Sequence, residues 1–441
     1  MSPHDSRLRN GLGLSVEPLP GHGGGLVSVA LTVAVGGDAD PVGRHGMAHL
    51  VEHLMFPRAA APEGHGPDGS DGAPDGHVAR VEGAGGVCNA ETHRDHTVFH
   101  TTVPAGMLTE VLAWEARRLL DFAPAPDVIR TEVSVIAEEI RGAAPGGRVW
   151  EAALGALHPG ARDCFGTAGE LAGVTTTEVE AFFRRHYRPE AMVLSVVGDV
   201  DARRVASTVG ALFSDLPAAP RAPAPAPAAT PSPAPGAPVR AGASATIRTA
   251  PLVSPVGGAA LGHPLPDPVR DRAGYLAQVV LAEVVGRVRL PRLVRRDPRI
   301  AAAGVTCGLH GQWLGSAAPD LTLARFAVPR PEAPASGSAS DPTAVALDAW
   351  RELLTELAAH PTDATEHRRA LNGLLLACHR RADSLTARSV SLGRTALIFP
   401  GSGGLDALPH DLARVTPAEV SAAARTLLTG PCSVTELGDA R

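Results

Sequence analysis

The chain has 441 residues, 44% of them hydrophobic, so it can bury large cores and is expected to form more than one domain. Its formal net charge is −6 at pH 7 and no long basic run is present, which argues against nucleic acid as a partner. The 5 cysteines are scattered and odd in number, which argues against a disulfide framework and favours a reducing compartment.

The first residues contain no apolar core of signal-peptide length, and no uncharged apolar run of about 18 residues follows later in the chain. We therefore expect a cytoplasmic protein without a membrane-spanning segment.

The first half of the chain alternates predicted strands and helices. A loop rich in Pro, Gly and Ala is predicted at residues 57–76, because its composition cannot bury enough apolar area to order itself. Strands are predicted at residues 12–19, 26–35, 87–92, 96–103 and 191–198. Helices are predicted at residues 46–56, 77–82, 107–122, 127–141, 175–187 and 201–213.

Residues 46–56 read GMAHLVEHLMF and place His49, Glu52 and His53 on one face of the predicted helix, because positions i, i+3 and i+4 are neighbours. Two histidines four residues apart can share one zinc ion, and a carboxylate between them can act on water. The alternative is an amphipathic core helix whose polar residues simply lie on its wetter side. The five-residue pattern alone does not decide between these interpretations.

A tract rich in Pro and Ala divides the chain into two parts of similar length. We predict an N-terminal domain at residues 1–216, a linker at 217–244 and a C-terminal domain at 245–441. The second domain repeats the order of strands and helices of the first, which favours an internal duplication. It contains no H-x-x-E-H motif of its own.

Several motifs in the same order resemble the pitrilysin and mitochondrial-processing-peptidase family of zinc peptidases. They are the opening strand NGLGLSVE, the helix GMAHLVEH, the strand GGVCNAETHRDHT, the helix EVSVIAEE and the segment YRPEAMVLSVVGD. The resemblance implies an α+β fold of two homologous halves. Each half would be a mostly antiparallel sheet covered by helices, and together they would form half of a clamshell-shaped chamber.

The same resemblance implies the roles of individual residues. His49, His53 and Glu139 correspond to the zinc ligands, Glu52 to the general base, and Glu132 to a second carboxylate that supports the site. Glu138 is a rival third ligand, but the seven-residue spacing from Glu132 matches Glu139. The implied activity is zinc-dependent peptide hydrolysis.

The predicted strand at residues 87–92 corresponds to the strand that binds substrate in the family. Asn89 and Ala90 would pair with the backbone of a bound peptide, although Asn89 is also typical of a turn between strands. His93 and His96 do not form a second metal pair in this interpretation, because a spacing of three in a strand would place them on opposite faces.

Active members of the family also use an Arg and a Tyr from a C-terminal-type half. Residues 289–296 resemble the start of that segment, but no Tyr follows Tyr275. We therefore predict that the chain is the zinc-bearing subunit of a heterodimer that acts on peptides or leader sequences, with a homologous metal-free partner supplying the Arg/Tyr pair. The alternatives are a non-catalytic structural subunit and a self-sufficient homodimer that uses Arg287 or Arg289.

Overall fold

The computed structural model describes residues 3–22, 24–56, 76–142, 145–217, 246–254, 257–329 and 341–438. The loop predicted at residues 57–76 and the linker predicted at 217–244 lie outside the described residues, except for Gly76 and Pro217. The chain forms two compact units, which we describe one at a time. The first unit contains Met1–Gly142, Asp163–Ala229 and Arg380–Asp406, and the second contains Ala143–Arg162, Thr230–His379 and Ala407–Arg441.

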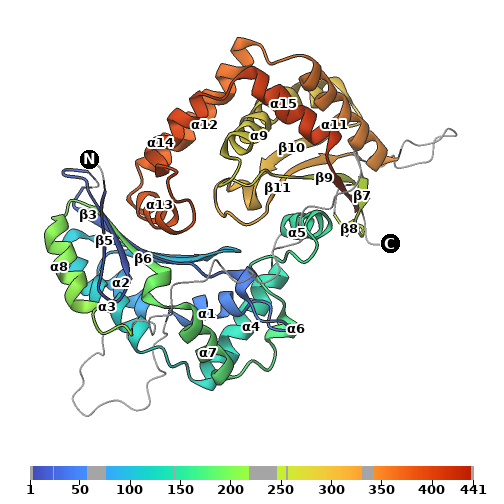
Figure 1. The fold of residues 1–441 in the computed structure, drawn as a ribbon. Helices are drawn as coiled ribbons and strands as arrows, with labels where there is room; N and C mark the ends of the chain where they lie inside the picture. Colours follow the sequence, from blue (N-terminus) through green and yellow to red (C-terminus); the bar gives the residue numbers. More distant parts are fainter. Residues whose placement is uncertain are drawn as a thin grey trace. The chain divides into compact units, whose positions relative to one another are not determined.

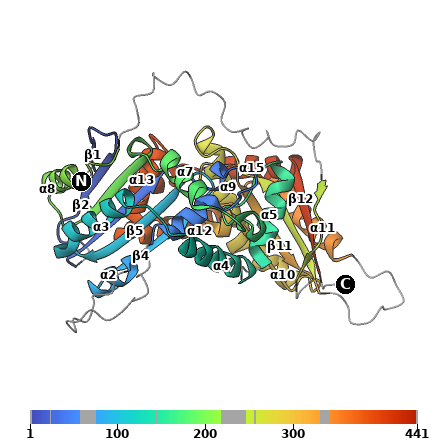
Figure 2. The same ribbon diagram turned by 90° about the horizontal axis from the view of Figure 1, so that it is seen from below.

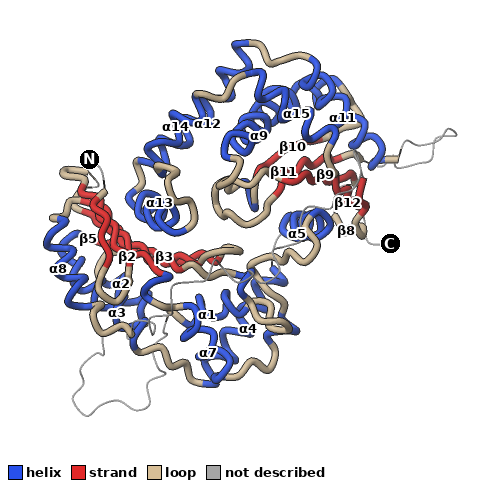
Figure 3. The backbone as a smooth tube through the Cα atoms, in the orientation of Figure 1, coloured by secondary structure: helices blue, strands red, loops and turns tan. Residues whose placement is uncertain are grey.

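A six-stranded sheet forms the centre of the first unit, with the strand order β1-β2-β6-β3-β5-β4 (Figures 1 and 3). Neighbouring strands are antiparallel except β2 and β6, which are parallel. The strands are β1 (His4–Arg7), β2 (Gly13–Pro18), β3 (Leu26–Val33), β4 (Val87–Thr92), β5 (Thr97–Pro104) and β6 (Met192–Gly198). Because β6 lies between β2 and β3, these two early strands are not direct neighbours.

Helices cover both faces of this sheet, so β2 and β6 are buried along their whole length and β3 from its second residue. Helix α13 (Leu385–Leu397) contacts β3, β5 and β6, whereas α8 (Ala202–Leu212) contacts β2 and α3 (Leu108–Leu120) contacts β5. Figure 1 shows α13 on the opposite side of the sheet from α1 (Met47–Leu54), α3 and α8. Strand β4 lies at the edge of the sheet with α2 (His77–Gly83) beside it (Figure 2).

The other helices of the first unit begin at side-chain caps or at proline. Thr175 forms a capping box with Glu178 at the start of α7 (Thr176–His186), and Asp201 caps α8. Proline occupies the first position of α4 (Pro126–Gly142), where its missing N–H is no loss. A short helix, α6 (Ala168–Leu171), begins after Thr167.

The second unit contains a sheet with the order β10-β11-β9-β12-β7, and β8 pairs with β12. Its strands are β7 (Thr246–Arg248), β8 (Leu252–Val253), β9 (Gly258–Pro264), β10 (Ala302–Cys307), β11 (Leu321–Ala327) and β12 (Cys432–Gly438). Its helices are α5 (Pro145–Leu157), α9 (Arg272–Val284), α10 (Leu290–Arg296), α11 (Pro342–Ala359), α12 (Ala364–Ala382) and α15 (Pro417–Thr429). Helix α14 (Gly404–Ala413) begins in the first unit and ends in the second.

The two sheets share one connectivity. When β7, β9, β10, β11 and β12 are matched in chain order to β2, β3, β4, β5 and β6, the spatial orders of the two sheets coincide. The parallel pair β2 and β6 then corresponds to the parallel pair β7 and β12. The predicted α+β fold with two similar halves is confirmed.

Each unit also contains one helix from the other half of the chain. Helix α5 precedes β6 in the sequence but packs on β9 and β12 of the second unit, where Leu154 and Leu157 are fully buried. Helix α13 follows α12 but packs on the sheet of the first unit. In the part of the chain that the structure describes, no helix combines the length and hydropathy needed to cross a membrane.

Candidate metal centre

Helix α1 carries the H-x-x-E-H motif, and its start is held firmly. The carboxylate of Asp40 accepts hydrogen bonds from the backbone N–H groups of Gly46 at 2.6 Å and Ala48 at 2.8 Å. Gly46 has a φ of 103°, a left-handed conformation that favours glycine. The apolar face of the helix, which includes Leu50 and Val51, is fully buried. The polar face is thereby turned away from the core.

Three side-chain atoms converge above this polar face. Nε2 of His49 lies 3.2 Å from Nε2 of His53, and Oε2 of Glu139 lies 3.6 Å from the first nitrogen and 3.5 Å from the second. A tetrahedral zinc ion with bonds of about 2.0–2.1 Å places its ligand atoms about 3.3–3.4 Å apart. Among the described residues, these three side chains form a group that could hold a metal ion.

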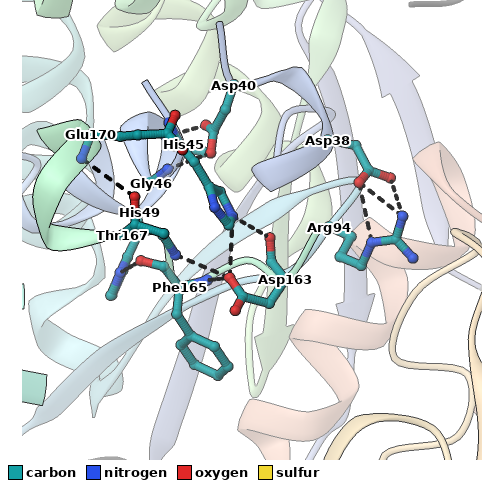
Figure 4. A network of polar contacts seen from close by, with 12 residues as sticks. Asp38, Asp40, His45, Gly46, His49, Arg94, Asp163, Phe165, Thr167 and Glu170 are labelled. Carbon is teal, nitrogen blue, oxygen red and sulfur yellow. Dashed lines mark hydrogen bonds and ion pairs between the residues drawn. The ribbon is translucent and has the colours of Figure 1, made fainter. Parts of the chain in front are cut away.

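The other ring nitrogen of each histidine has its own acceptor. Nδ1 of His49 donates to the backbone carbonyl of Phe165 at 2.9 Å, and both residues are labelled in Figure 4. Nδ1 of His53 lies 3.1 Å from Oε2 of the buried Glu132. With the proton on Nδ1, each ring presents the lone pair of Nε2 to the shared point. Two lone pairs and a carboxylate oxygen so close together could hold a cation, and the donor set suits zinc.

The acidic side chains around this point also favour a cation there. Burial disfavours the charged form of His53, but the hydrogen bond to Glu132 and the charges of Glu139 and Glu52 outweigh it, so the pKa of His53 is raised. The two imidazoles are 11% and 14% exposed and the Glu139 side chain is 50% exposed. The site is therefore negative in potential and open on the Glu139 side.

The two acidic neighbours on α4 behave differently. Glu139 reaches both histidines, whereas the side chain of Glu138 is 68% exposed and pairs with Arg141 on the same helix. Glu132, two turns before Glu139, reaches the opposite nitrogen of His53. The structure therefore places Glu132 and Glu139, and not Glu138, beside the histidines.

Glu52 lies on the same face of α1 and faces the end of β4. Its carboxylate accepts a hydrogen bond from the hydroxyl of Thr92, the last residue of that strand. Asn89 is exposed on β4, and its side-chain oxygen accepts a hydrogen bond from the N–H of Ala90 at 2.9 Å. Among the described strands, β5 is the one that pairs with β4, which leaves the other edge of β4 without a described partner.

The prediction for His93 and His96 is wrong in its geometry. Both residues lie in the turn between β4 and β5, not in one continuous strand, and their rings stack with centroids 4.4 Å apart. The guanidinium of Arg394 on α13 lies against both rings, with Nη2 2.6 Å from Nε2 of His93 and Nε 2.9 Å from Nε2 of His96. Nη2 also donates to Glu91 at 3.0 Å. An arginine therefore supplies the positive charge at this cluster.

Phe165, Asp163 and Arg394 were not predicted to be parts of the site or its surroundings. Phe165 acts through its backbone carbonyl, which no residue type signals in a sequence. Arg394 lies 298 and 301 residues from the two histidines that it contacts, a separation that no local pattern bridges.

Comparisons with known families agree with this geometry. Residues 22–143 match the model described as insulinase (peptidase family M16), and residues 173–308 match the model described as the peptidase M16 inactive domain. The first match contains α1, β4 and Glu139. A two-half α+β fold with such a helix defines a class of metallopeptidase-like proteins, and this chain belongs to peptidase family M16. The predicted resemblance is confirmed.

Curated relatives are similar over about half of their length. An uncharacterized zinc protease of Mycobacterium bovis is 30% identical over 208 residues, which cover 46% of this chain and 44% of the relative. The zinc protease PqqE of Helicobacter pylori is 27% identical over 214 residues, or 46% and 45% of the two chains. The beta subunit of the mitochondrial-processing peptidase of Saccharomyces cerevisiae is 25% identical over 227 residues, or 48% and 44%.

Solved structures show that the whole chain shares one fold with other proteins. A protease from Helicobacter pylori superposes with a TM-score of 0.77 at 18% identity, covering 99% of both chains. A peptidase M16 inactive domain from Pseudomonas fluorescens gives 0.75 at 16% identity, covering 100% of this chain and 98% of that one. The periplasmic protease PqqL of Escherichia coli gives 0.69 at 20% identity, and this chain covers only 48% of it.

Proposed function

We propose that this chain is a zinc-dependent endopeptidase subunit. The observation that carries the proposal is the convergence of His49 Nε2, His53 Nε2 and Glu139 Oε2, at separations of 3.2 to 3.6 Å, beside the carboxylate of Glu52. The three side chains would hold the ion and leave a fourth position open, as catalytic zinc sites do. Zinc bound there would supply Lewis acidity and lower the pKa of water to about 7.

The residues of the chain would carry the remaining chemistry. Glu52 takes the proton from the attacking water and later delivers it to the leaving amine, and the hydroxyl of Thr92 orients its carboxylate. Glu132 holds Nδ1 of His53, so that Nε2 stays deprotonated toward the ion. In this proposal Glu132 acts through His53 and does not touch the substrate.

A peptide substrate would lie along β4. This strand is at the edge of the described sheet and contacts α1, so a peptide that pairs with it passes the polar face of the helix. The backbone of Asn89 and Ala90 would then form part of the added pairing, and the exposed Asn89 side chain would contact a substrate amide. The proposed substrates are unfolded peptides or leader sequences.

The chain's tyrosines support a second subunit. Both are buried, Tyr187 at 7% and Tyr275 at 2% exposure, and the hydroxyl of Tyr275 accepts a hydrogen bond from Leu314 N–H. Because both side chains are buried, neither hydroxyl is exposed for contact with a bound substrate. Loss of one such donor costs about 2.7–4 kcal/mol in other enzymes. We therefore propose a heterodimer in which a homologous, metal-free partner supplies the Arg/Tyr pair.

The test is peptide cleavage by the purified chain with and without proteins that co-purify from the native host. We expect zinc binding by the chain alone, weak cleavage alone, and strong cleavage with the partner. Glu52→Gln should keep the zinc but reduce cleavage by about 10²–10⁴-fold, because the proton acceptor is lost. Robust cleavage by the isolated chain would rule out the need for a partner.

A self-sufficient homodimer is the second candidate. In that arrangement Arg287 is better suited than Arg289 to contact the substrate, because Arg289 donates to Glu356 at 2.6 Å and to Glu366 at 2.8 Å. Within the described residues, Arg287 forms an ion pair with Glu283 one turn earlier, and its side chain is 56% exposed. Mass in solution together with Arg287→Ala and Arg289→Ala separates the two assemblies. A non-catalytic structural subunit would show no cleavage in any combination.

None of the described cysteines forms a disulfide, which is in keeping with a cytoplasmic location, where the compartment is reducing. Fractionation of the native host tests this part of the proposal.

A further inference from the structure

We propose that His45 is a positioning residue for the metal centre: together with Asp163 it holds the carbonyl of Phe165 against Nδ1 of His49. The inference rests on the proposed function in that it assigns His49 to a metal, but each contact that carries it belongs to the chain alone. His45 lies just before α1, one helical turn ahead of His49, and is 4% exposed.

His45 and His49 contact the same short loop, residues 163–167. Nε2 of His45 lies 3.0 Å from the backbone carbonyl of Asp163 and 3.2 Å from its Oδ1 (Figure 4). Because a carbonyl oxygen can only accept, Nε2 of His45 is the donor. The backbone closes the same contact from the other side, since Thr167 N–H donates to the carbonyl of His45 at 3.2 Å.

Asp163 transmits this contact to Phe165. Its Oδ1 accepts hydrogen bonds from the N–H groups of Phe165 at 2.9 Å and Gly166 at 3.1 Å. Two fixed N–H groups in succession set the orientation of the peptide units on either side of Phe165, and hence the direction of its carbonyl. That carbonyl accepts the Nδ1–H of His49 at 2.9 Å.

Close packing prevents the loop from moving independently of α1. Gly166 has a φ of +95°, and a Cβ there would lie 2.8 Å from the carbonyl oxygen of His45 and overlap Gly46. Gly46 is itself held by Asp40. The loop and the start of the helix are therefore packed backbone to backbone, and the side chain of His45 is one of the groups that join them.

The charges of the pair suit this role. Burial lowers the pKa of His45, but the hydrogen bonds and charge of Asp163, with the charge of Asp40, outweigh it and raise that pKa. The pKa of Asp163 is lowered, since the contact with His45 and the N–H groups of Gly166 and Phe165 outweigh its burial. Both shifts favour an ion pair, which strengthens a hydrogen bond of this kind.

The experiment measures zinc affinity of the full chain by competition with a chelator. His45→Ala should weaken zinc binding by about 10-fold, the lower end of the 10–100-fold range for residues outside the ligand set, since it acts through one more contact. His45→Gln should recover most of the affinity, because its amide can donate from the position of Nε2. The matched control is His367→Ala, which removes another buried histidine bonded to a backbone carbonyl, that of Val415 in the second unit.

A second readout does not depend on zinc. Nitrogen NMR of the metal-free chain should show His49 in the Nδ1–H form in the wild type and in His45→Gln, and a mixture of tautomers in His45→Ala. Asp163→Asn should give an intermediate mixture. If the wild type binds no zinc, the proposed function fails, and the tautomer of His49 still decides this inference. An unchanged tautomer in His45→Ala would overturn it, as would zinc affinity within twofold of the wild type.

Discussion

Glu132 and Glu139 lie seven residues apart on α4, and the structure brings them to different atoms of His53. Glu139 reaches Nε2 at 3.5 Å, and Glu132 reaches Nδ1 at 3.1 Å. Seven residues are close to two turns, so both carboxylates point from one face of the helix. The spacing could be read from the sequence, but their division between the two sides of one imidazole required the packing of α4 against α1.

Glu132→Gln tests the role of that contact. The amide oxygen can still accept from Nδ1 of His53 but carries no charge, so we expect zinc affinity to fall by about 10–100-fold. Chelator competition measures the change. Glu138→Gln, on the same helix with an exposed side chain, is the control and should bind zinc as the wild type does. Equal affinities for the two variants would show that Glu132 does not tune the site.

The lowered pKa of Glu91 predicts how the stability of the fold depends on pH. The hydrogen bond with His93, followed by the charge of Arg394, outweighs burial and lowers the pKa of Glu91 to about 2 from its usual 4.5. A lowered carboxyl pKa stabilises the fold above the unfolded-state pKa, and the contribution is lost as pH falls toward the folded value.

Glu91→Gln should therefore reduce the free energy of unfolding at neutral pH, and its deficit relative to the wild type should shrink as pH falls from about 4.5 to 2. Denaturant unfolding of both proteins across this range measures the difference. A deficit that does not change with pH would exclude the charged contact as its source.

Among the secondary-structure elements, helix α13 packs closely on one face of the first sheet, where it contacts β3, β5 and β6. Ser389 contacts Ser28 at 2.9 Å and Thr386 contacts Thr102 at 2.8 Å, so polar pairs as well as the apolar Val390 fix the helix on the sheet. Gly393 allows the closest approach. A Cβ at this position would overlap the hydroxyl of Thr32 and lie 2.8 Å from its Cβ.

Gly393→Ala should destabilise the first unit by about 1–3 kcal/mol, the usual cost of overpacking a close contact. The matched control is Gly155→Ala on α5, where a Cβ meets no atom within 4 Å. That control should stabilise its helix by about 0.5–1 kcal/mol, because alanine loses less backbone freedom than glycine. Denaturation midpoints of both variants measure the effects, and destabilisation of similar size in the two would contradict this packing argument.

Local patterns predicted strand β4 and helices α1, α3, α4, α7 and α8, and the starts of α4, α7 and α8 also carry a proline or a side-chain cap. Strand β9 was not predicted, since its sequence GAALGHP has no β-branched residue, and it is recognisable only between β11 and β12. Helices α5 and α13 were not predicted either. Their burial is against sheets formed largely by the other half of the chain, which no local pattern shows. His93 and His96 were misplaced because a turn was taken for a strand.

At the scale of the whole molecule, the two halves repeat one sheet topology but only the first carries the metal-binding motif. Because α5 and α13 each pack in the unit of the other half, the unit with the candidate site contains residues from both halves, including Arg394 beside the end of β4. The second half therefore contributes to the unit that carries the candidate site, although it has no motif of its own. The match to 48% of PqqL is in keeping with a fold that also occurs as half of a longer chain.

The zinc content of the purified full-length chain tests the central claim most directly. We expect one zinc ion per chain after dialysis, unchanged in Glu52→Gln, and at least 10-fold weaker binding in His49→Ala, His53→Ala and Glu139→Ala. Elemental analysis with a chelator titration provides both numbers. Retention of one tightly bound zinc by His53→Ala, or no zinc in the wild type, would contradict the account.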